Sequence, residues 1–324
     1  MVMSSHSSFT VKTKTRAEIK LASEERIKNM GESAARPGDR RCLKDIEPRL
    51  FSDDGRPEQG GVVELYGPEG TGKTELLYHL ICRCVLPKSA GGLELDVMFV
   101  DTDYSLDMFR LVSILDSRLN KALPKSSPSA GSDEEALLRS CLSRLLVVHC
   151  SSSAQLLLTL HFLENSFSSR PSLELLLIDS ISAFYWLDRC EGGPSFSKQE
   201  EKLSKCSDLL SRLLRDYRIT VFATCHSIRR VQTGLSSSAS LSYSSDSDRS
   251  YLCRSWQRLV THRLMCFRQE AANNTSDEAG SSIQQRIQQV FRVHCISSFS
   301  SSGSKPYKTN SFYVTDAGVE FTSV

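Results

Sequence analysis

Eight consecutive residues have the types and spacing of a loop that binds phosphate. They follow the pattern G-x-x-x-x-G-K-[ST] and are Gly67, Pro68, Glu69, Gly70, Thr71, Gly72, Lys73 and Thr74. Glycines let the backbone close around a phosphate group, and a following helix adds the positive end of its dipole. Lys73 would then supply a positive charge to the β- and γ-phosphates, and the Thr74 hydroxyl would bind Mg²⁺. The motif therefore predicts a binding site for ATP and Mg²⁺.

Asp179 is a second candidate for this site. It ends the most hydrophobic stretch of the chain, residues 173–179. In open α/β folds, ligands bind beyond the carboxyl ends of the strands, so an acid at this position is well placed to hold Mg²⁺ through water. The alternative is a carboxylate that caps the next helix. The phosphate-loop motif favours the metal role, because such a loop needs an acidic partner.

Alternating strand and helix patterns surround these residues and predict an α/β fold. The expected strands are 61–66, 95–101, 145–149, 173–179 and 219–225, and the expected helices are 71–83, 105–120, 153–164 and 200–217. Residues 123–132 read as a loop. This order predicts a mostly parallel, twisted sheet with helices on both faces. A strand before the motif and a helix after it favour phosphate binding over a glycine-rich turn without a ligand.

Composition predicts three parts of the chain. Residues 1–42 are polar without apolar periodicity, and we expect a flexible arm. Residues 43–268 form the predicted core, in which the serine-rich residues 227–251 are expected to be a mobile loop. Residues 269–324 form a β-rich C-terminal extension of the core. Strand patterns at 258–268, at the end of the core, and at 289–295 and 311–314 together suggest that the sheet continues.

Length, charge and cysteine content restrict the class of protein. The 324 residues suit one α/β domain with extensions, and the formal net charge of +2 neither requires nor excludes nucleic acid. No apolar run reaches the length of about 18 residues that would suggest a membrane span, and the N-terminus lacks an apolar secretory segment. The 11 cysteines include no Cys-x-x-Cys pair. We expect reduced thiols in a nuclear or cytoplasmic protein without a membrane partner.

The order of the motifs resembles the core of RecA-type recombinases. The residues that carry this resemblance are 67–74, 101–103, 175–180 and 221–226. Five stretches resemble more closely a eukaryotic recombinase paralogue of DNA repair, namely 43–48, 67–75, 86–89, 182–186 and 318–321. The resemblance extends from about Arg41 to the C-terminus. It implies a RecA-like P-loop NTPase core.

Three positions bear on whether bound ATP is hydrolysed. Asp103 lies where RecA-type enzymes carry the glutamate that activates water, and its side chain is one methylene shorter. His226 lies where they carry a glutamine that senses the γ-phosphate, although a strand-end histidine without this role is the alternative. Arg110 lies where recombinases stack an arginine on adenine, with a solvated helix arginine as the alternative. We therefore expect ATP binding, with hydrolysis that is weak or dependent on a partner.

Two segments correspond to the loops with which recombinases contact DNA. They are 188–199 and 227–251, and the second contains Arg229 and Arg230. The arginine pair is a candidate phosphate contact, but the loop has few basic residues and few aromatic residues for stacking. Residues 1–60 also lack the Phe-x-x-Ala peptide that joins recombinase protomers. The resemblance thus implies a hetero-oligomeric complex with other recombinase paralogues, which contacts single-stranded or branched DNA through the complex.

The function implied is an accessory role in homologous-recombination repair of DNA double-strand breaks, in the nucleus and also the cytoplasm. The chain would be an ATP-binding subunit that assists assembly of the recombinase filament on single-stranded DNA. One alternative is an active DNA-dependent ATPase that itself acts on DNA strands or junctions. Another is a small-molecule kinase, which would need a lid with arginines that the sequence does not offer.

Overall fold

The structure is a computed structural model that describes residues 43–51, 60–122, 130–227, 251–269, 289–297 and 308–322. These residues belong to one compact unit, 41–324. The predicted arm 1–42 lies outside the described residues, and so do residues 228–250 of the predicted serine-rich loop. Within the described part, no helix is both long enough and apolar enough to cross a membrane.

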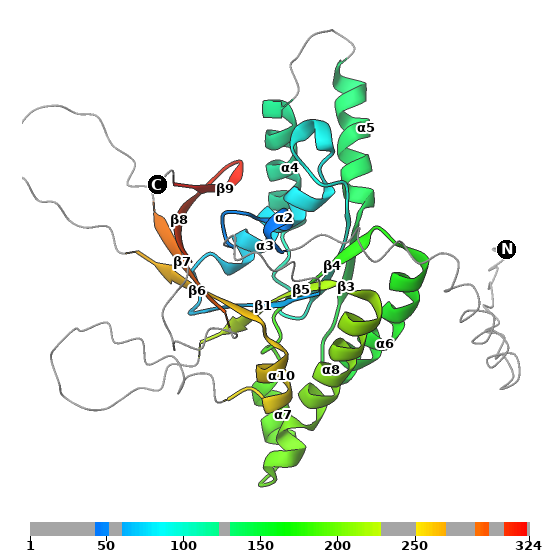
Figure 1. Cartoon of the computed structure of the whole chain (residues 1–324), viewed down its shortest axis with the longest axis vertical. Helices are drawn as coiled ribbons and strands as arrows, with labels where there is room; N and C mark the ends of the chain where they lie inside the picture. The colour runs from blue at the N-terminus through cyan, green and yellow to red at the C-terminus, as the bar shows by residue number, and fades with distance from the viewer. Residues whose placement is uncertain are drawn as a thin grey trace, which may run out of the picture. The chain divides into compact units, whose positions relative to one another are not determined.

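The described strands form one sheet (Figure 1). They are β1 (Val62–Gly67), β2 (Asp96–Asp101), β3 (Leu145–His149), β4 (Leu173–Asp179), β5 (Thr220–His226), β6 (His262–Arg268), β7 (Val290–Ser297), β8 (Lys308–Thr315) and β9 (Gly318–Phe321). Their order is β3-β2-β4-β5-β1-β6-β7-β8-β9. The strands from β3 to β6 are parallel, and those from β6 to β9 are antiparallel. This confirms the predicted fold class, with its parallel core and C-terminal strands.

Helices cover both faces of the sheet (Figure 1). They are α2 (Leu43–Ile46), α3 (Lys73–Val85), η1 (Lys88–Ala90), α4 (Met108–Ala122), α5 (Ala130–Ser143), α6 (Ser153–Ser169), α7 (Tyr185–Glu191), α8 (Phe196–Tyr217) and α10 (Arg254–Leu259). Side chains of α3 and α4 pack on one face, and those of α6, α8 and α10 pack on the other.

Strand β1 shows how the sequence produces these two layers. Val63 and Leu65 belong to the core on the α3 side, whereas Val62 and Tyr66 belong to the core on the α8 side. Successive side chains of a strand point to opposite faces, so a strand covered on both faces is apolar throughout. Glu64 is the exception, and its carboxylate accepts a hydrogen bond from Trp256 Nε1 at 2.7 Å.

Several predicted boundaries were wrong, and three of them change how neighbouring elements are connected. The expected loop 123–132 ends earlier, because helix α5 begins at Ala130 and continues through strong helix formers such as Glu134 and Leu138. The expected strand 258–268 begins only at His262, because the short helix α10 comes first and is anchored by the buried Trp256.

The third correction concerns the expected loop 188–199. Residues up to Glu191 complete α7, and α8 begins at Phe196, so only four residues connect the two helices. Lys202 of α8 stabilises this arrangement, because its ammonium group lies 3.1 Å from Asp188 Oδ1 and 2.5 Å from Glu191 Oε2. The segment is therefore mostly helical.

Candidate nucleotide-binding site

The loop 67–74 connects β1 to α3 at the carboxyl edge of the parallel sheet (Figure 1). Gly67 pairs with His226 of β5, and a Cβ at Gly67 would lie 2.5 Å from the carbonyl oxygen of Cys266 in β6. Gly72 precedes the helix with a φ of 82°, a backbone conformation that residues with a Cβ rarely adopt. Packing and backbone geometry therefore both require glycine in this loop.

Lys73 is buried within the loop. Its Nζ donates hydrogen bonds to the carbonyl oxygens of Gly67 at 2.8 Å and Pro68 at 2.7 Å. Burial lowers the pKa of Lys73, an effect that nearby acidic groups such as Asp179 oppose. The loop thus places the ammonium group at the start of α3. Both this positive charge and the helix dipole favour binding of an anion there.

The structure brings Thr74 and Asp179 together, although they are far apart in the sequence. Thr74 Oγ1 donates to Asp179 Oδ2 at 3.1 Å. Asp179 also accepts hydrogen bonds from Ser105 Oγ at 3.0 Å and from the hydroxyl of Thr224. Burial raises the pKa of Asp179, against these hydrogen bonds. A hydroxyl oxygen beside a buried carboxylate is a donor set that suits Mg²⁺, and a cation would offset the cost of burying this charge.

Sequence reasoning missed Ser105 and Thr224. Ser105 follows the end of β2, and Thr224 lies two residues before the end of β5; both strands neighbour β4 in the sheet. Their hydroxyl groups hold both oxygens of the Asp179 carboxylate. The signal that could have identified them is a hydroxyl residue near the end of a strand adjacent to the acidic one.

Asp103 and His226 contact each other at the same edge of the sheet. The His226 Nε2 and Asp103 Oδ2 atoms are 3.0 Å apart, and both side chains are partly exposed. Burial alone would raise the pKa of Asp103, but the hydrogen bonds from His226 and Ser180 lower it. His226 Nδ1 is buried and has no hydrogen-bond partner among the described residues. Asp103, which was predicted to activate water, is therefore hydrogen-bonded to His226, which was predicted to sense the γ-phosphate.

Arg110 lies beside the loop but is bound by its own chain. Its guanidinium donates two hydrogen bonds of 3.1 Å to the carboxylate of Glu75 in α3. It also donates to the backbone carbonyl oxygens of Thr315 at 2.6 Å and Asp316 at 3.2 Å. Arg110 thus joins α3 and α4 to the β8–β9 turn, and its stacking on adenine stays a prediction. Arg229 and Arg230 lie outside the described residues.

The parallel sheet, the loop at the end of β1 and the acid at the end of β4 define an α/β fold with a P-loop motif. A family model described as Rad51 matches residues 52–126. The mouse protein named DNA repair protein XRCC2 is 47% identical over 296 residues, which cover 90% of this chain and 95% of the mouse protein. The chain belongs to the XRCC2 family of RecA-type recombinase paralogues, as its resemblance indicated.

More distant relatives share the same core. The Arabidopsis thaliana protein named DNA repair protein XRCC2 homolog is 28% identical over 254 residues, covering 64% of this chain and 68% of the plant protein. The Saccharomyces cerevisiae protein named DNA repair protein RAD51 is 27% identical over 188 residues, covering 56% of this chain and 41% of the yeast protein. The yeast protein thus matches about half of this chain.

Proposed function

We propose that this chain is an ATP-binding accessory subunit in homologous-recombination repair of DNA double-strand breaks. The observation that carries the proposal is the meeting of Lys73, Thr74 and Asp179 at the sheet edge of a chain that belongs to the XRCC2 family. The ammonium group binds the β- and γ-phosphates of ATP. The Thr74 hydroxyl, and Asp179 through water, hold Mg²⁺, which neutralises phosphate charge when it is bound.

In this proposal, ATP hydrolysis is weak or depends on a partner. A general base must be free to accept a proton from the attacking water. The Asp103 carboxylate is instead held by His226 at 3.0 Å, and its pKa is lowered by hydrogen bonds. The nucleotide then acts mainly as a bound ligand that organises the loop and the strand ends around it.

The proposed setting is a hetero-oligomeric complex with other recombinase paralogues. The complex assists assembly of the recombinase filament on single-stranded DNA and contacts single-stranded or branched DNA, in the nucleus and also the cytoplasm. The relationship to the mouse protein named DNA repair protein XRCC2 supports this setting. A DNA-dependent ATPase that acts on strands or junctions by itself is the second candidate.

Two measurements on purified proteins test the proposal. In the first, filament assembly on single-stranded DNA is followed with a paralogue complex that contains or lacks this chain. Assembly should be faster with the chain, and equal rates would contradict the accessory role. In the second, ATP turnover of the isolated chain is measured with and without single-stranded DNA. A turnover of roughly 1 s⁻¹ or more, the range of ordinary enzymes, would favour the second candidate.

A further inference from the structure

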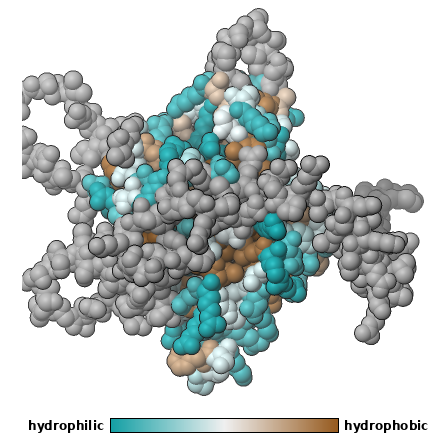
Figure 2. All heavy atoms as spheres, viewed as in Figure 1, coloured by the Kyte–Doolittle hydropathy of each residue, from teal (hydrophilic) through white to brown (hydrophobic). Residues whose placement is uncertain are grey.

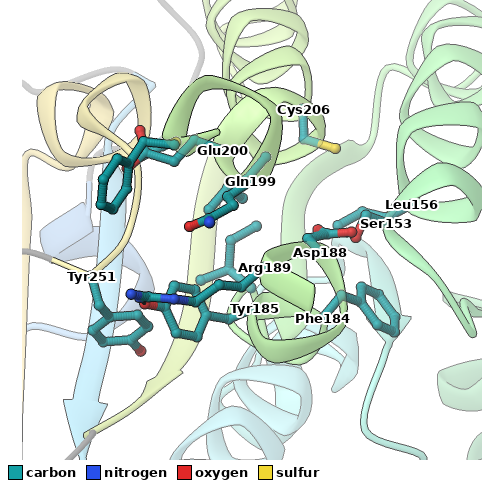
Figure 3. A pocket seen from close by; sticks show the side chains of 14 residues that line it. Ser153, Leu156, Phe184, Tyr185, Asp188, Arg189, Gln199, Glu200, Cys206 and Tyr251 are labelled. Atoms are coloured by element: carbon teal, nitrogen blue, oxygen red, sulfur yellow. Dashed lines mark hydrogen bonds between the residues drawn. The ribbon is translucent and has the colours of Figure 1, made fainter. Parts of the chain in front are cut away.

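A cavity of about 220 Å³ lies between α6, α7 and α8, apart from the nucleotide site (Figure 3). Apolar side chains that include Leu156, Ile181 and Leu203 line it. Aromatic rings complete the lining, and they are Phe184, Tyr185, Phe196 and Tyr251. Sites for small molecules usually enclose about 300–1,000 Å³. The smaller cavity suits one large side chain better than a cofactor.

The cavity opens onto an exposed aromatic surface. Phe196 lines the cavity and is 71% exposed, and Trp186, which is 59% exposed, meets the Tyr185 ring edge-on at 4.9 Å. Figure 2 shows brown and white spheres among teal ones at the lower end of the molecule, where α7 and α8 meet. Exposed aromatic residues beside a preformed cavity are typical of a protein-binding surface.

The charges around the cavity do not favour nucleic acid. Asp188 is held by Ser153 Oγ at 2.5 Å and by Lys202 Nζ at 3.1 Å, and Lys202 also pairs with Glu191. The single ammonium group of Lys202 is thus shared by two carboxylates and is not an unpaired positive charge. Binding of nucleic acid by a surface depends on unpaired positive charge for the phosphates. The DNA contact expected for residues 188–199 thus has little support from this part of the surface, and a protein partner fits better.

Arg189 indicates the chemistry of that partner. Its guanidinium lies 5.7 Å from the centre of the Tyr185 ring and donates a hydrogen bond to the Tyr185 hydroxyl. Among the residues that the structure describes, no carboxylate forms a salt bridge with it. A guanidinium pairs best with a carboxylate. Glu200, which also lines the cavity, would repel a run of acids, so a single carboxylate is expected.

We propose that this cavity binds the aromatic side chain of a segment from a partner protein, with a neighbouring carboxylate of that segment on Arg189. The aromatic ring packs against Phe196 and Tyr185 and fills the apolar space between α7 and α8. None of the cavity residues belongs to the loop 67–74 or forms a hydrogen bond with Asp179. The cavity is linked to the nucleotide site through Tyr251, whose hydroxyl donates a hydrogen bond to the backbone carbonyl oxygen of His226 at 2.5 Å.

The experiment is selection of short random peptides, displayed on phage, against the full-length chain. The selected peptides should share an aromatic residue with Asp or Glu within two positions. The Phe196→Ser variant should bind them roughly tenfold or more weakly. The matched control is Phe109→Ser, which removes a 91% exposed phenylalanine from α4 and should bind them normally. Circular dichroism would verify that both variants fold.

A charge exchange makes the test specific for Arg189. The Arg189→Glu variant should lose the selected peptides and bind versions in which the acidic residue is replaced by lysine. The proposal is overturned if no aromatic and acidic sequence is enriched, or if the peptides bind all variants equally. It is also overturned if a single-stranded oligonucleotide, rather than a peptide, crosslinks to the wild-type cavity and is lost in Phe196→Ser.

Discussion

At the residue scale, the contact between Asp103 and His226 bears most directly on the fate of bound ATP. His226 Nε2 lies 3.0 Å from the Asp103 carboxylate, and its buried Nδ1 has no hydrogen-bond partner in the described part of the chain. A neutral imidazole with its proton on Nε2 satisfies this geometry, because a proton on Nδ1 would be a buried donor without an acceptor. This hydrogen bond lowers the pKa of Asp103 and so makes its carboxylate a weaker base.

We predict that Asp103→Glu combined with His226→Gln raises ATP turnover by roughly tenfold or more, because a free carboxylate with one more methylene reaches further towards the attacking water. The rate of phosphate release, with and without single-stranded DNA, measures the ATP turnover of each variant. The control is Asp103→Asn with His226→Gln, which has no carboxylate and should stay at the wild-type rate or below. Equal rates for the two double variants would contradict the account.

The sequence allowed both residues to be predicted as site residues, but not their contact. They are separated by 123 positions along the chain. They meet only because β4 alone lies between β2 and β5 in the sheet, a neighbourhood set by the order of the strands. The hydrogen bonds of Arg110 to the β8–β9 turn depend in the same way on how distant elements pack.

At the element scale, a buried polar cluster holds the segment after α2 against α3 and α4. His79 Nε2 donates to the buried Glu47 carboxylate at 2.5 Å, and Arg118 Nη2 donates to His79 Nδ1 at 2.9 Å. Both ring nitrogens are therefore satisfied by a neutral imidazole. Burial lowers the pKa of His79 from 6.5 to about 4, against the charge of Glu47.

This cluster predicts a loss of stability in mild acid. Between pH 6.5 and about 4, the unfolded chain binds a proton at His79 that the folded chain does not. The stability that the neutral His79 contributes is complete above pH 6.5 and is lost as the pH falls. Between pH 7.5 and 5, the free energy of unfolding should decrease by about 2 kcal/mol for this reason. The free energy of unfolding, measured by thermal unfolding, should fall less over this pH range for His79→Gln than for the wild type. An equal fall in the two proteins would contradict the assignment of a neutral His79. The lowered pKa of Glu47 matters only in stronger acid.

Elements differed in how well the sequence predicted them. The strands 145–149 and 173–179 were predicted with their observed bounds, because each is a nearly continuous apolar run that ends at a polar residue. The starts of α5, α8 and α10 were missed. These depend on tertiary contacts, such as Lys202 with Glu191 and Trp256 with Glu64, that no local pattern reveals.

At the scale of the whole molecule, near-neutral charge and paired surface charges fit a subunit that contacts DNA through a complex. The net charge is +2, and the acids and bases where α7 and α8 meet largely neutralise one another. Affinity for DNA and its dependence on salt both grow with the number of phosphates that the protein neutralises. An isolated chain with a near-neutral net charge should therefore bind single-stranded DNA weakly.

We predict that the isolated chain binds a single-stranded oligonucleotide more weakly than the paralogue complex, with a shallower dependence on salt. Fluorescence anisotropy over a series of salt concentrations measures both quantities. The Arg229→Ala/Arg230→Ala variant should change the affinity of the complex only slightly. A large loss of affinity on this change would instead identify the two arginines as a main DNA contact.

Calorimetry tests most directly whether the loop 67–74 binds ATP with Mg²⁺. Titration of ATP with Mg²⁺ into the wild-type chain, alone and in its complex, should show one site. Lys73→Ala should weaken binding roughly 100-fold, because it removes a charge-assisted contact to phosphate. Lys88→Ala, a surface change, should leave binding intact. No uptake of nucleotide by the wild type in either state, or equal uptake by Lys73→Ala, would contradict the account.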